Sequence, residues 1–462
     1  MPEIRSFAIT LHFYSPRAYE YIRNVFGKKL PAQRTLRKWC EGIDGSPGCS
    51  SEALTAIKLK IREASSNNKH LICNLVMDEM AIRKHINYDH IQKKYFGYVD
   101  FGNKLDNNKE NRSEAKEALV FLINAVNDRW KLPVAYFLVN GLNSTEKTDI
   151  FKEVLVFLSD VDITISSVTF DGAASNFAMC RALGAKIEPS NIQASFQHPV
   201  TKQPVFLLLD ICHMLKLVRN TLASKVILDG EGNMILWSYI DKLEKMQAAD
   251  GVLLANKLRD QHINFGNQKM KTKLAAQTIS CSVAALVEYL KMGHQGFKDC
   301  GATIKFIRTF NNLFDILNSK NKFGKMYKKP LNPQTASEIF EYFDEALAYI
   351  HSLKIKTEYG QRYILESQSR TGFIGFVIGL TNFKNLFNVY CRDSNRIDYL
   401  LAYKFSQDHI ATFFSAIRSR GGFNNNPTAM QFASAYLKDS LFIMKSSPLL
   451  MQTVSIMIPP IF

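Results

Sequence analysis

Two apolar runs of strand length, each ending at an aspartate, constrain the fold of this chain more than any other feature of its sequence. Residues 71–77 (LICNLVM) lead to Asp78, and residues 163–170 (ITISSVTF) lead to Asp171. Short apolar runs of this length are typical of β-strands. We therefore expect two strands, each with a carboxylate at its C-terminal end.

The neighbouring segments indicate what kind of sheet these strands belong to. Further strand-length runs lie at residues 95–99, 119–123, 134–138 and 206–209. We expect helices over residues 145–158, with Ser144 as the candidate N-cap, and over residues 175–183. The strands first follow one another, as in an antiparallel meander, and then alternate with helices, which predicts a mixed α/β sheet.

The two aspartates have a catalytic and a structural interpretation. On neighbouring strands, Asp78 and Asp171 would lie side by side and repel each other unless divalent cations bind between them. Paired carboxylates that hold two Mg²⁺ ions roughly 4 Å apart are typical of phosphoryl transfer. The alternative is that each aspartate is simply a favourable turn residue after a strand.

The charge of the chain predicts a polyanionic partner. The sequence has 58 Lys and Arg against 42 Asp and Glu, a net charge of +16. The excess is concentrated in residues 1–70 and 251–330, although solvated helical faces would also explain such runs. No apolar stretch approaches the ~20 residues that span a bilayer, so we favour nucleic acid over a membrane.

The first basic segment has the layout of a helix-turn-helix. A helix that begins at Ser15 is ended by residues 27–31 (GKKLP), and a second helix begins near Ala32. The basic side chains of this second helix that could reach DNA are Arg34, Arg37 and Lys38. Helical hairpins without any DNA contact share this outline, so both interpretations stay open.

The second basic segment lies in about 180 residues that read as mostly helical, for example 274–291, 304–318 and 333–353. No G-x-x-x-x-G-K-[ST] string occurs there, so any nucleotide site works without a P-loop. Asp315 and Asn318, three residues apart on one helix, can point the same way. A carboxylate can accept hydrogen bonds from guanine N1 and N2; otherwise both residues are ordinary solvated positions.

Several strings together resemble the P-element transposase family. They are LVMDEM (75–80), VTFDGAASN (168–176), DICHMLKLVRN (210–220), LFDILN (313–318) and FSQDHIATFFSAIRSRGG (405–422). The openings TLHFYSPRAYEYIR (10–23) and LPAQRTLRKW (30–39) are similar to the helix-turn-helix region of that family. The resemblance therefore covers nearly the whole chain.

This resemblance implies an RNase H-like mixed sheet with a large helical GTP-binding insertion, preceded by a helix-turn-helix. The expected divisions are the helix-turn-helix region (1–68), the first part of the RNase H-like domain (69–215), the insertion (216–394), the final RNase H-like helix (395–422) and a C-terminal helical segment (423–462). The zinc-coordinating THAP module that often begins family members is not recognisable here.

The resemblance also implies roles for individual residues. Asp78 and Asp171 become the first two metal-binding carboxylates, while the third family carboxylate, a Glu, is replaced by Ala411. Ile410, Phe413, Phe414 and Ile417 keep the buried helical seam around that position. We expect a weakened or inactive centre, either a natural copy that has lost catalysis or a deliberate Glu→Ala change.

For the nucleotide, the resemblance places guanine recognition on Asp315, Asn318 and Asp408. The residues implied for the phosphates and ribose are Lys271, Ser280 and Lys257, although lysines in such a run are normally surface residues. His213, in a helix after Asp210, is expected either to support the active site or to be a core histidine.

Two functional hypotheses follow. The first is a DNA transposase that acts on transposon ends and target DNA in the nucleus, with Mg²⁺ for catalysis and GTP as a structural cofactor, in a homo-oligomer. The alternative is a non-catalytic DNA-binding protein derived from a transposase, which retains the GTP and DNA contacts. Ala411 is the residue that keeps both hypotheses open.

Overall fold

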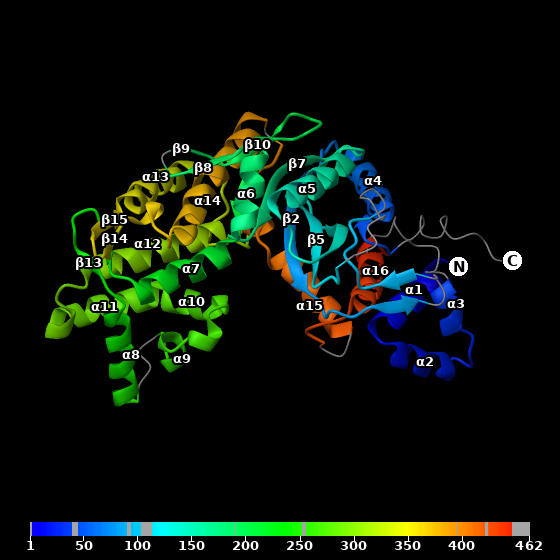
Figure 1. The fold of residues 1–462 in the computed structure, drawn as a ribbon, viewed down its shortest axis with the longest axis horizontal. Helices are drawn as coiled ribbons and strands as arrows, with labels where there is room; N and C mark the ends of the chain where they lie inside the picture. Colours follow the sequence, from blue (N-terminus) through cyan, green and yellow to red (C-terminus); the bar gives the residue numbers. More distant parts are fainter. Residues whose placement is uncertain are drawn as a thin grey trace. The chain divides into compact units, whose positions relative to one another are not determined.

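The structure, a computed structural model, describes residues 2–38, 45–89, 94–102, 113–189, 191–251, 256–394, 396–420 and 424–445. The chain forms two compact units (Figure 1). The first contains Met1–Ile165, His198–Gln203 and Gln407–Phe462, and the second contains Ser166–Gln197 and Pro204–Ser406. Each unit is therefore assembled from segments that lie far apart in the sequence.

The first unit is built on an antiparallel sheet. Its strands are β1 (Gly48–Cys49), β2 (Ile72–Ala81), β5 (Glu117–Ala125) and β6 (Lys131–Val139). β2 pairs with β5, β5 with β6, and β6 with β1, all antiparallel. Nearly every residue of β5 and β6 is buried, so both faces of the sheet are covered.

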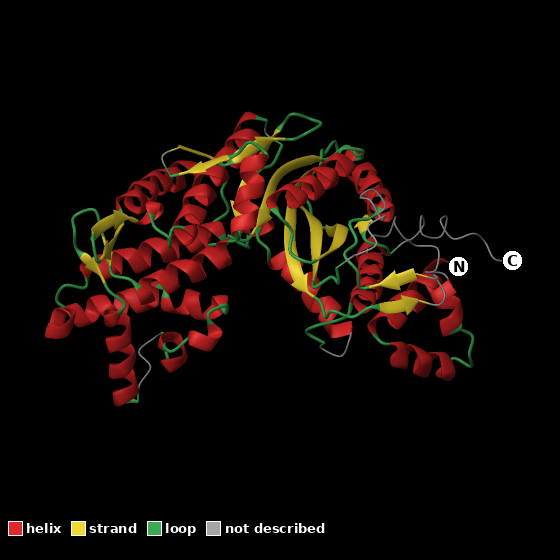
Figure 2. Ribbon diagram, viewed as in Figure 1, coloured by secondary structure: helices red, strands yellow, loops and turns green. Residues whose placement is uncertain are grey.

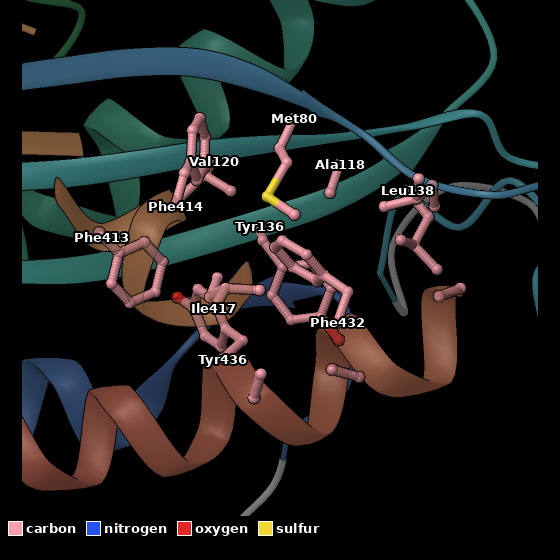
Figure 3. Close-up of a cluster of buried hydrophobic side chains, with 14 of the residues drawn as sticks. Met80, Ala118, Val120, Tyr136, Leu138, Phe413, Phe414, Ile417, Phe432 and Tyr436 are labelled. Atoms are coloured by element: carbon pink, nitrogen blue, oxygen red, sulfur yellow. The ribbon is translucent and has the colours of Figure 1, made fainter. Parts of the chain in front are cut away.

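Helices cover the two faces of this sheet. They are α4 (Ser51–Ser65), α5 (Ser144–Leu158), α15 (Asp408–Arg420) and α16 (Ala429–Lys445). Val120 and Tyr136 share a buried cluster with apolar residues of α15 and α16 (Figure 3). Phe121 lies on the other side, with its ring centroid 5.9 Å from that of Phe137 and 6.2 Å from that of Phe151 in α5. Alternation along the strands thus divides the core into two layers.

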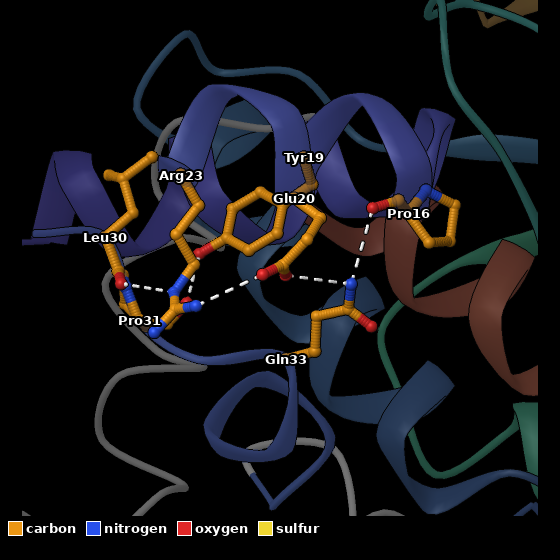
Figure 4. A network of polar contacts seen from close by, with 7 residues as sticks. All are labelled: Pro16, Tyr19, Glu20, Arg23, Leu30, Pro31 and Gln33. Atoms are coloured by element: carbon orange, nitrogen blue, oxygen red, sulfur yellow. Dashed lines mark hydrogen bonds and ion pairs between the residues drawn. The ribbon is translucent and has the colours of Figure 1, made fainter. Parts of the chain in front are cut away.

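Three N-terminal helices precede the sheet. They are α1 (Pro2–Tyr14), α2 (Pro16–Val25) and α3 (Gln33–Lys38). Ser15 caps α2, because its Oγ accepts the N–H of Ala18 at 3.1 Å. The buried Tyr19 hydroxyl donates to the carbonyl of Pro31 at 2.6 Å and so holds the turn against α2 (Figure 4). The helix-turn-helix expected from the sequence is therefore present.

The second unit holds a mixed group of strands. β7 (Thr164–Phe170), whose first two residues belong to the first unit, pairs in parallel with β11 (Pro204–Leu209), and β10 (Ser195–Gln197) pairs antiparallel with β11. The helices nearest to them are α6 (Ala174–Ala182), α7 (Ile211–Ser224) and α14 (Thr371–Phe387). The buried Asn382 of α14 donates to the carbonyls of Ala194 and Leu207, both at 2.7 Å, and thereby fastens this helix to the strands.

The rest of the second unit is mostly helical, as the colouring by secondary structure shows (Figure 2). Its helices are α8 (Ser238–Asp250), α9 (Asp260–Ile263), α10 (Thr272–Thr278), α11 (Cys281–Gly293), α12 (Gly301–Leu317) and α13 (Ala336–Ser352). The unit also contains a small sheet that the sequence did not predict. Its strands lie in the order β13 (Met234–Ile235), β12 (Ile227–Leu228), β14 (Lys354–Thr357) and β15 (Gly360–Tyr363). Phe310 of α12 packs its ring 5.5 Å from that of Phe373 in α14.

Three local expectations were wrong. The strand expected to end before Asp78 continues to Ala81, because its pairing with β5 extends to that residue. The N-cap of α5 is Asn143 rather than Ser144, and it forms a capping box with Glu146. The helix expected over residues 274–291 is broken between α10 and α11, where Ser280 caps the new helix.

The mixed sheet with a largely helical insertion confirms the expected fold class. Among the described helices, none combines the length and the apolar character that crossing a bilayer requires.

Candidate functional site

Asp78 points toward the face of the sheet that α15 covers. The side chains of successive strand residues alternate between faces, and Val76 and Met80, its neighbours two positions away, belong to the cluster with α15. Asp78 is half-buried, and its Oδ1 accepts the N–H of Glu79 at 2.9 Å. The Glu79 side chain points the other way, where its Oε1 lies 2.7 Å from Nζ of the buried Lys147 in α5.

A hydrogen bond fixes the first turn of α15 beside Asp78. Nε2 of the buried Gln407 donates to the carbonyl of Met77 at 2.9 Å, one residue before the aspartate. The N–H of Ala411 donates to the carbonyl of Gln407 at 2.9 Å, so Ala411 follows one helical turn later. The side chain of Ala411 is exposed and carries no oxygen, whereas Ile410 beside it is buried.

Asp171 directly follows β7 in the second unit, as predicted. Its Oδ1 accepts the N–H of Ala173 at 3.0 Å and Nδ2 of the buried Asn176 at 2.7 Å. Both hydrogen bonds reach the same oxygen, so Oδ2 can accept a further ligand. These contacts hold the carboxylate in one orientation at the start of α6.

His213 lies near Asp171 in the same unit. Burial lowers the pKa of His213, the positive charge of Lys216 lowers it further, and the negative charge of Asp171 acts in the opposite direction. The N–H of His213 donates to Oδ2 of Asp210, which caps α7, at 2.9 Å. This supports the interpretation of His213 as a neighbour of the candidate site.

A second group of candidate residues gathers around α12. The N–H of Cys281 donates to Oδ1 of Asn311 at 3.3 Å, which brings the start of α11 and its cap Ser280 next to α12. Burial raises the pKa of the Cys281 thiol, and the nearby carboxylate of Asp315 raises it further. The structure thus brings Ser280 and Asp315 into one neighbourhood.

Two side chains in this neighbourhood are unusual for solvated positions. Burial raises the pKa of the Asp315 carboxyl, although Lys328, with its Nζ 3.7 Å from Oδ1, opposes that shift. Oδ1 of Asn318 is buried and has no hydrogen-bond partner among the described residues. A buried acceptor without a donor is costly, so a ligand with N–H groups, such as a guanine base, fits this place.

The remaining sequence candidates lie apart from these contacts. Nζ of the exposed Lys271 donates to Oε1 of Gln268 at 3.0 Å, and Lys257 is also exposed. Asp408 belongs to the first unit, at the start of α15. Burial lowers the pKa of the partly buried Lys131, and the negative charge of Asp408 acts to raise it. Among the described residues, no group of three or more His, Cys, Asp or Glu side chains is arranged to hold a metal ion.

The candidates for DNA contact lie on α3. Arg34 is exposed there. Arg37 and Lys38 fall within the same helix, but their side chains lie outside the described residues.

The sequence reasoning missed Gln407 as an anchor and Lys147 as a partner of Glu79. Gln407 stands next to Asp408 in the QDH string, which was the available signal. Nothing in the sequence connects Lys147, on a helix 68 positions further along, with Glu79.

Four family models match the chain, in sequence order. They are the transposable element P transposase-like HTH domain (residues 1–39), the TNP-like RNase H N-terminal domain (45–184), the TNP-like GTP-binding insertion domain (212–330) and the TNP-like RNase H C-terminal domain (403–437).

Two curated proteins are similar over nearly the whole chain. The human protein DNA transposase THAP9 is 30% identical over 459 residues, which is 96% of this chain and 50% of that protein. The Drosophila melanogaster protein Transposable element P transposase is 24% identical over 440 residues, 92% of this chain and 52% of that protein. The chain thus spans about half the length of both relatives.

The fold also matches that of a solved structure. The Drosophila P element transposase strand transfer complex matches with a TM-score of 0.78 at 21% sequence identity, covering 98% of this chain and 93% of that one. At this identity the match demonstrates the fold alone.

Proposed function

The chain belongs to the P-element transposase-like family, and on that premise we propose that it acts on DNA by metal-dependent phosphoryl transfer. The observation that carries the proposal is the hydrogen bond from Gln407 to Met77. It fixes the helix that carries Ala411 beside the strand that carries Asp78. The carboxylate of Asp78 and position 411 of α15 therefore lie on the same side of the sheet.

The second carboxylate directly follows β7 in the second unit. Oδ1 of Asp171 accepts hydrogen bonds from the N–H of Ala173 and from Nδ2 of Asn176, which leaves Oδ2 able to accept a further ligand. These contacts support Asp171 as a metal-binding carboxylate.

Asp78 and Asp171 would be the residues that hold Mg²⁺. Both side chains are carboxylates, the ligand type that suits a hard divalent cation. When bound, the metal would offset phosphate charge and lower the pKa of a coordinated water. Because Ala411 offers no third carboxylate, we propose that cleavage and strand transfer are weakened or lost.

We also propose that the insertion binds GTP at the α12 neighbourhood. Asp315 and Asn318 would recognise the base through acceptor oxygens, with Ser280 near the ribose. Lys271 and Lys257 would contribute positive charge toward the phosphates. Oδ1 of Asn318, which is buried and has no hydrogen-bond partner in the described part of the chain, most directly supports a ligand with N–H donors.

DNA is the proposed macromolecular partner, which implies a nuclear location and, at paired transposon ends, a homo-oligomer. Arg34, Arg37 and Lys38 on α3 would contact the duplex. The divisions at residues 68, 215, 394 and 422 remain part of this proposal. The alternative, a non-catalytic DNA-binding protein, is favoured by one specific observation, the alanine at position 411.

Strand transfer separates the two functions. We would compare the chain with its Ala411→Glu variant on donor DNA that carries terminal repeats, in Mg²⁺ and GTP. Activity in the variant alone supports a disabled transposase, and activity in neither supports the binding protein. Robust activity of the unchanged chain would refute the proposed role of position 411.

GTP binding is tested by titration calorimetry on the same protein. We expect Asp315→Ala to weaken GTP binding roughly tenfold, the loss of a charge-assisted hydrogen bond pair of about 1.4 kcal/mol or more. Glu288→Ala, which removes an exposed carboxylate of α11 that pairs with Arg308, is the matched control. Equal affinities for GTP and ATP would contradict guanine recognition.

A further inference from the structure

A cavity of about 170 Å³ lies in the second unit next to Asp171. One wall is the segment that follows β7, including Gly172 and Arg181 of α6. The other wall is the start of α14, including Arg370 and Thr371. The cavity is separate from the α12 neighbourhood, and the proposed function gives none of its side chains a role.

Close packing fixes the two walls relative to each other. A Cβ atom on Gly172 would lie 2.6 Å from Cγ2 of Thr371, which is closer than real contacts allow. The backbone directly after Asp171 is therefore packed against the residue directly after Arg370. This contact places the start of α14 close to the segment that follows Asp171.

The cavity is lined by two arginines, of which one has no ion pair among the described residues and the other has a weak one. Within the described part of the chain, Arg370 takes part in no ion pair. Arg181 pairs with Glu188, Nε to Oε1 at 3.1 Å, but the two side chains are 42% and 56% exposed, so this pair is weak. None of the described residues that line the cavity carries a carboxylate.

Two guanidinium groups at one cavity suit a phosphate group. The planar guanidinium donates two parallel hydrogen bonds to phosphate oxygens, and it is less strongly hydrated than an ammonium group. Apolar side chains, among them Phe177 and Ile374, also line the cavity. They would pack against the carbon atoms of a sugar, so the lining suits a phosphodiester better than a free anion.

We propose that this cavity binds a backbone phosphate of the DNA strand that runs past Asp171, with Arg370 as its main cation and Arg181 as the second. The inference rests on the proposed function, since it takes the strand near Asp171 to be DNA. Its role is to hold the strand in place beside the carboxylates. The phosphates of GTP share the same chemistry and are the competing source.

The test is the salt dependence of DNA binding by the whole chain. Binding of a fluorescein-labelled 30-base-pair duplex is measured by anisotropy at several KCl concentrations. Each phosphate contact contributes about 0.9 to the slope of log K against log salt. We expect Arg370→Gln to lower the slope by about 0.9 and to weaken binding several-fold at low salt, whereas Arg370→Lys keeps the slope.

The matched control is Arg362→Gln. Arg362 is an exposed arginine of β15 in the same unit and does not line the cavity. We expect this variant to keep both the slope and the affinity. Equal losses from Arg362→Gln and Arg370→Gln would overturn the inference, because they would show a diffuse charge effect.

The other outcomes are equally decisive. An unchanged slope and affinity in Arg370→Gln would overturn the inference while leaving the proposed function intact. No DNA binding by the unchanged chain would overturn both. A calorimetric titration with GTP separates the two phosphate sources: unchanged GTP affinity in Arg370→Gln supports the DNA phosphate, and weakened GTP affinity with unchanged DNA binding overturns it.

Discussion

The contact between α7 and α14 depends on a glycine, and replacing it gives the sharpest test of the packing. A Cβ atom on Gly372 would lie 2.9 Å from Cβ of Leu217, 3.0 Å from N of Val218 and 3.1 Å from O of Met214. Two of these three atoms belong to the α7 backbone, so no side-chain rotation relieves the clash. Gly372→Ala therefore has to push the two helices apart.

The size of the effect follows from a matched glycine on the same helix. A Cβ atom on Gly379 would meet only Cδ1 of Leu317, at 3.1 Å, the end of a side chain that can rotate. Both substitutions gain about 1 kcal/mol of helix propensity, which cancels in the comparison. The difference between Gly372→Ala and Gly379→Ala is then the cost of overpacking, about 1–3 kcal/mol.

The assay is thermal unfolding followed by far-ultraviolet circular dichroism. A difference of 1 kcal/mol shifts the midpoint by about 2–4 °C for a unit of this size. We expect Gly372→Ala to melt several degrees below Gly379→Ala, and Gly379→Ala to melt at or above the unchanged chain. If Gly372→Ala melted as high as Gly379→Ala, the close approach of α14 to α7 would be wrong.

Three further substitutions test local features. Asn143→Ala should cost about 1 kcal/mol of helix stability, whereas Ser144→Ala should be nearly neutral. The urea unfolding midpoints of the two variants measure this, and a lower midpoint for Ser144→Ala than for Asn143→Ala would contradict Asn143 as the cap. Burial lowers the pKa of His198, whose Nδ1 accepts two backbone N–H groups. The folded state favours the neutral imidazole. The contribution of His198 to the free energy of unfolding is therefore complete above the ordinary pKa of about 6.5, and it is lost as the pH falls through the lowered pKa of the folded state. His198→Asn, which keeps an acceptor, should flatten the fall of the melting midpoint below that pH, and an unchanged profile would contradict this. Tyr19→Phe removes the hydroxyl that donates to the carbonyl of Pro31 and should lower the stability of the N-terminal helices by about 1 kcal/mol. Amide exchange in these helices should become faster, and unchanged exchange would refute the role of this hydrogen bond.

The parts of the fold that were predictable are those with a strong local signal. The continuous apolar runs at residues 119–123 and 134–138 predicted strands, and the structure confirms them as β5 and β6. The expected strand end before Asp78 was wrong because β2 keeps pairing with β5 through residues of mixed burial. A boundary set by hydrogen bonds to another strand leaves little trace in the apolar pattern.

The break between α10 and α11 was missed for a different reason. Apolar residues continue through the segment, so helical periodicity alone predicts one helix. The backbone leaves helical geometry at Ile279, with φ −89° and ψ 75°, and Ser280 then caps α11. A serine inside a periodic run is ambiguous, because its hydroxyl can serve a cap or remain solvated.

The candidate site could be located only in part from the sequence. Asp171 stands at a strand end, where a local rule finds it. Gln407 donates to a carbonyl 330 residues earlier in the chain, and no local rule connects those positions. The resemblance to a family identified position 411, whereas the contact that places it beside Asp78 came from the structure.

The surroundings of Ala411 also make the catalytic test interpretable. Ile410, Phe413 and Phe414 hold α15 in the core, while the side chain at 411 is exposed. A glutamate there would be solvated and would bury no charge, because position 411 is exposed one helical turn after Gln407. Ala411→Glu should therefore fold as well as the unchanged chain. A gain of strand transfer in that variant would then report the restored carboxylate and not a change in stability.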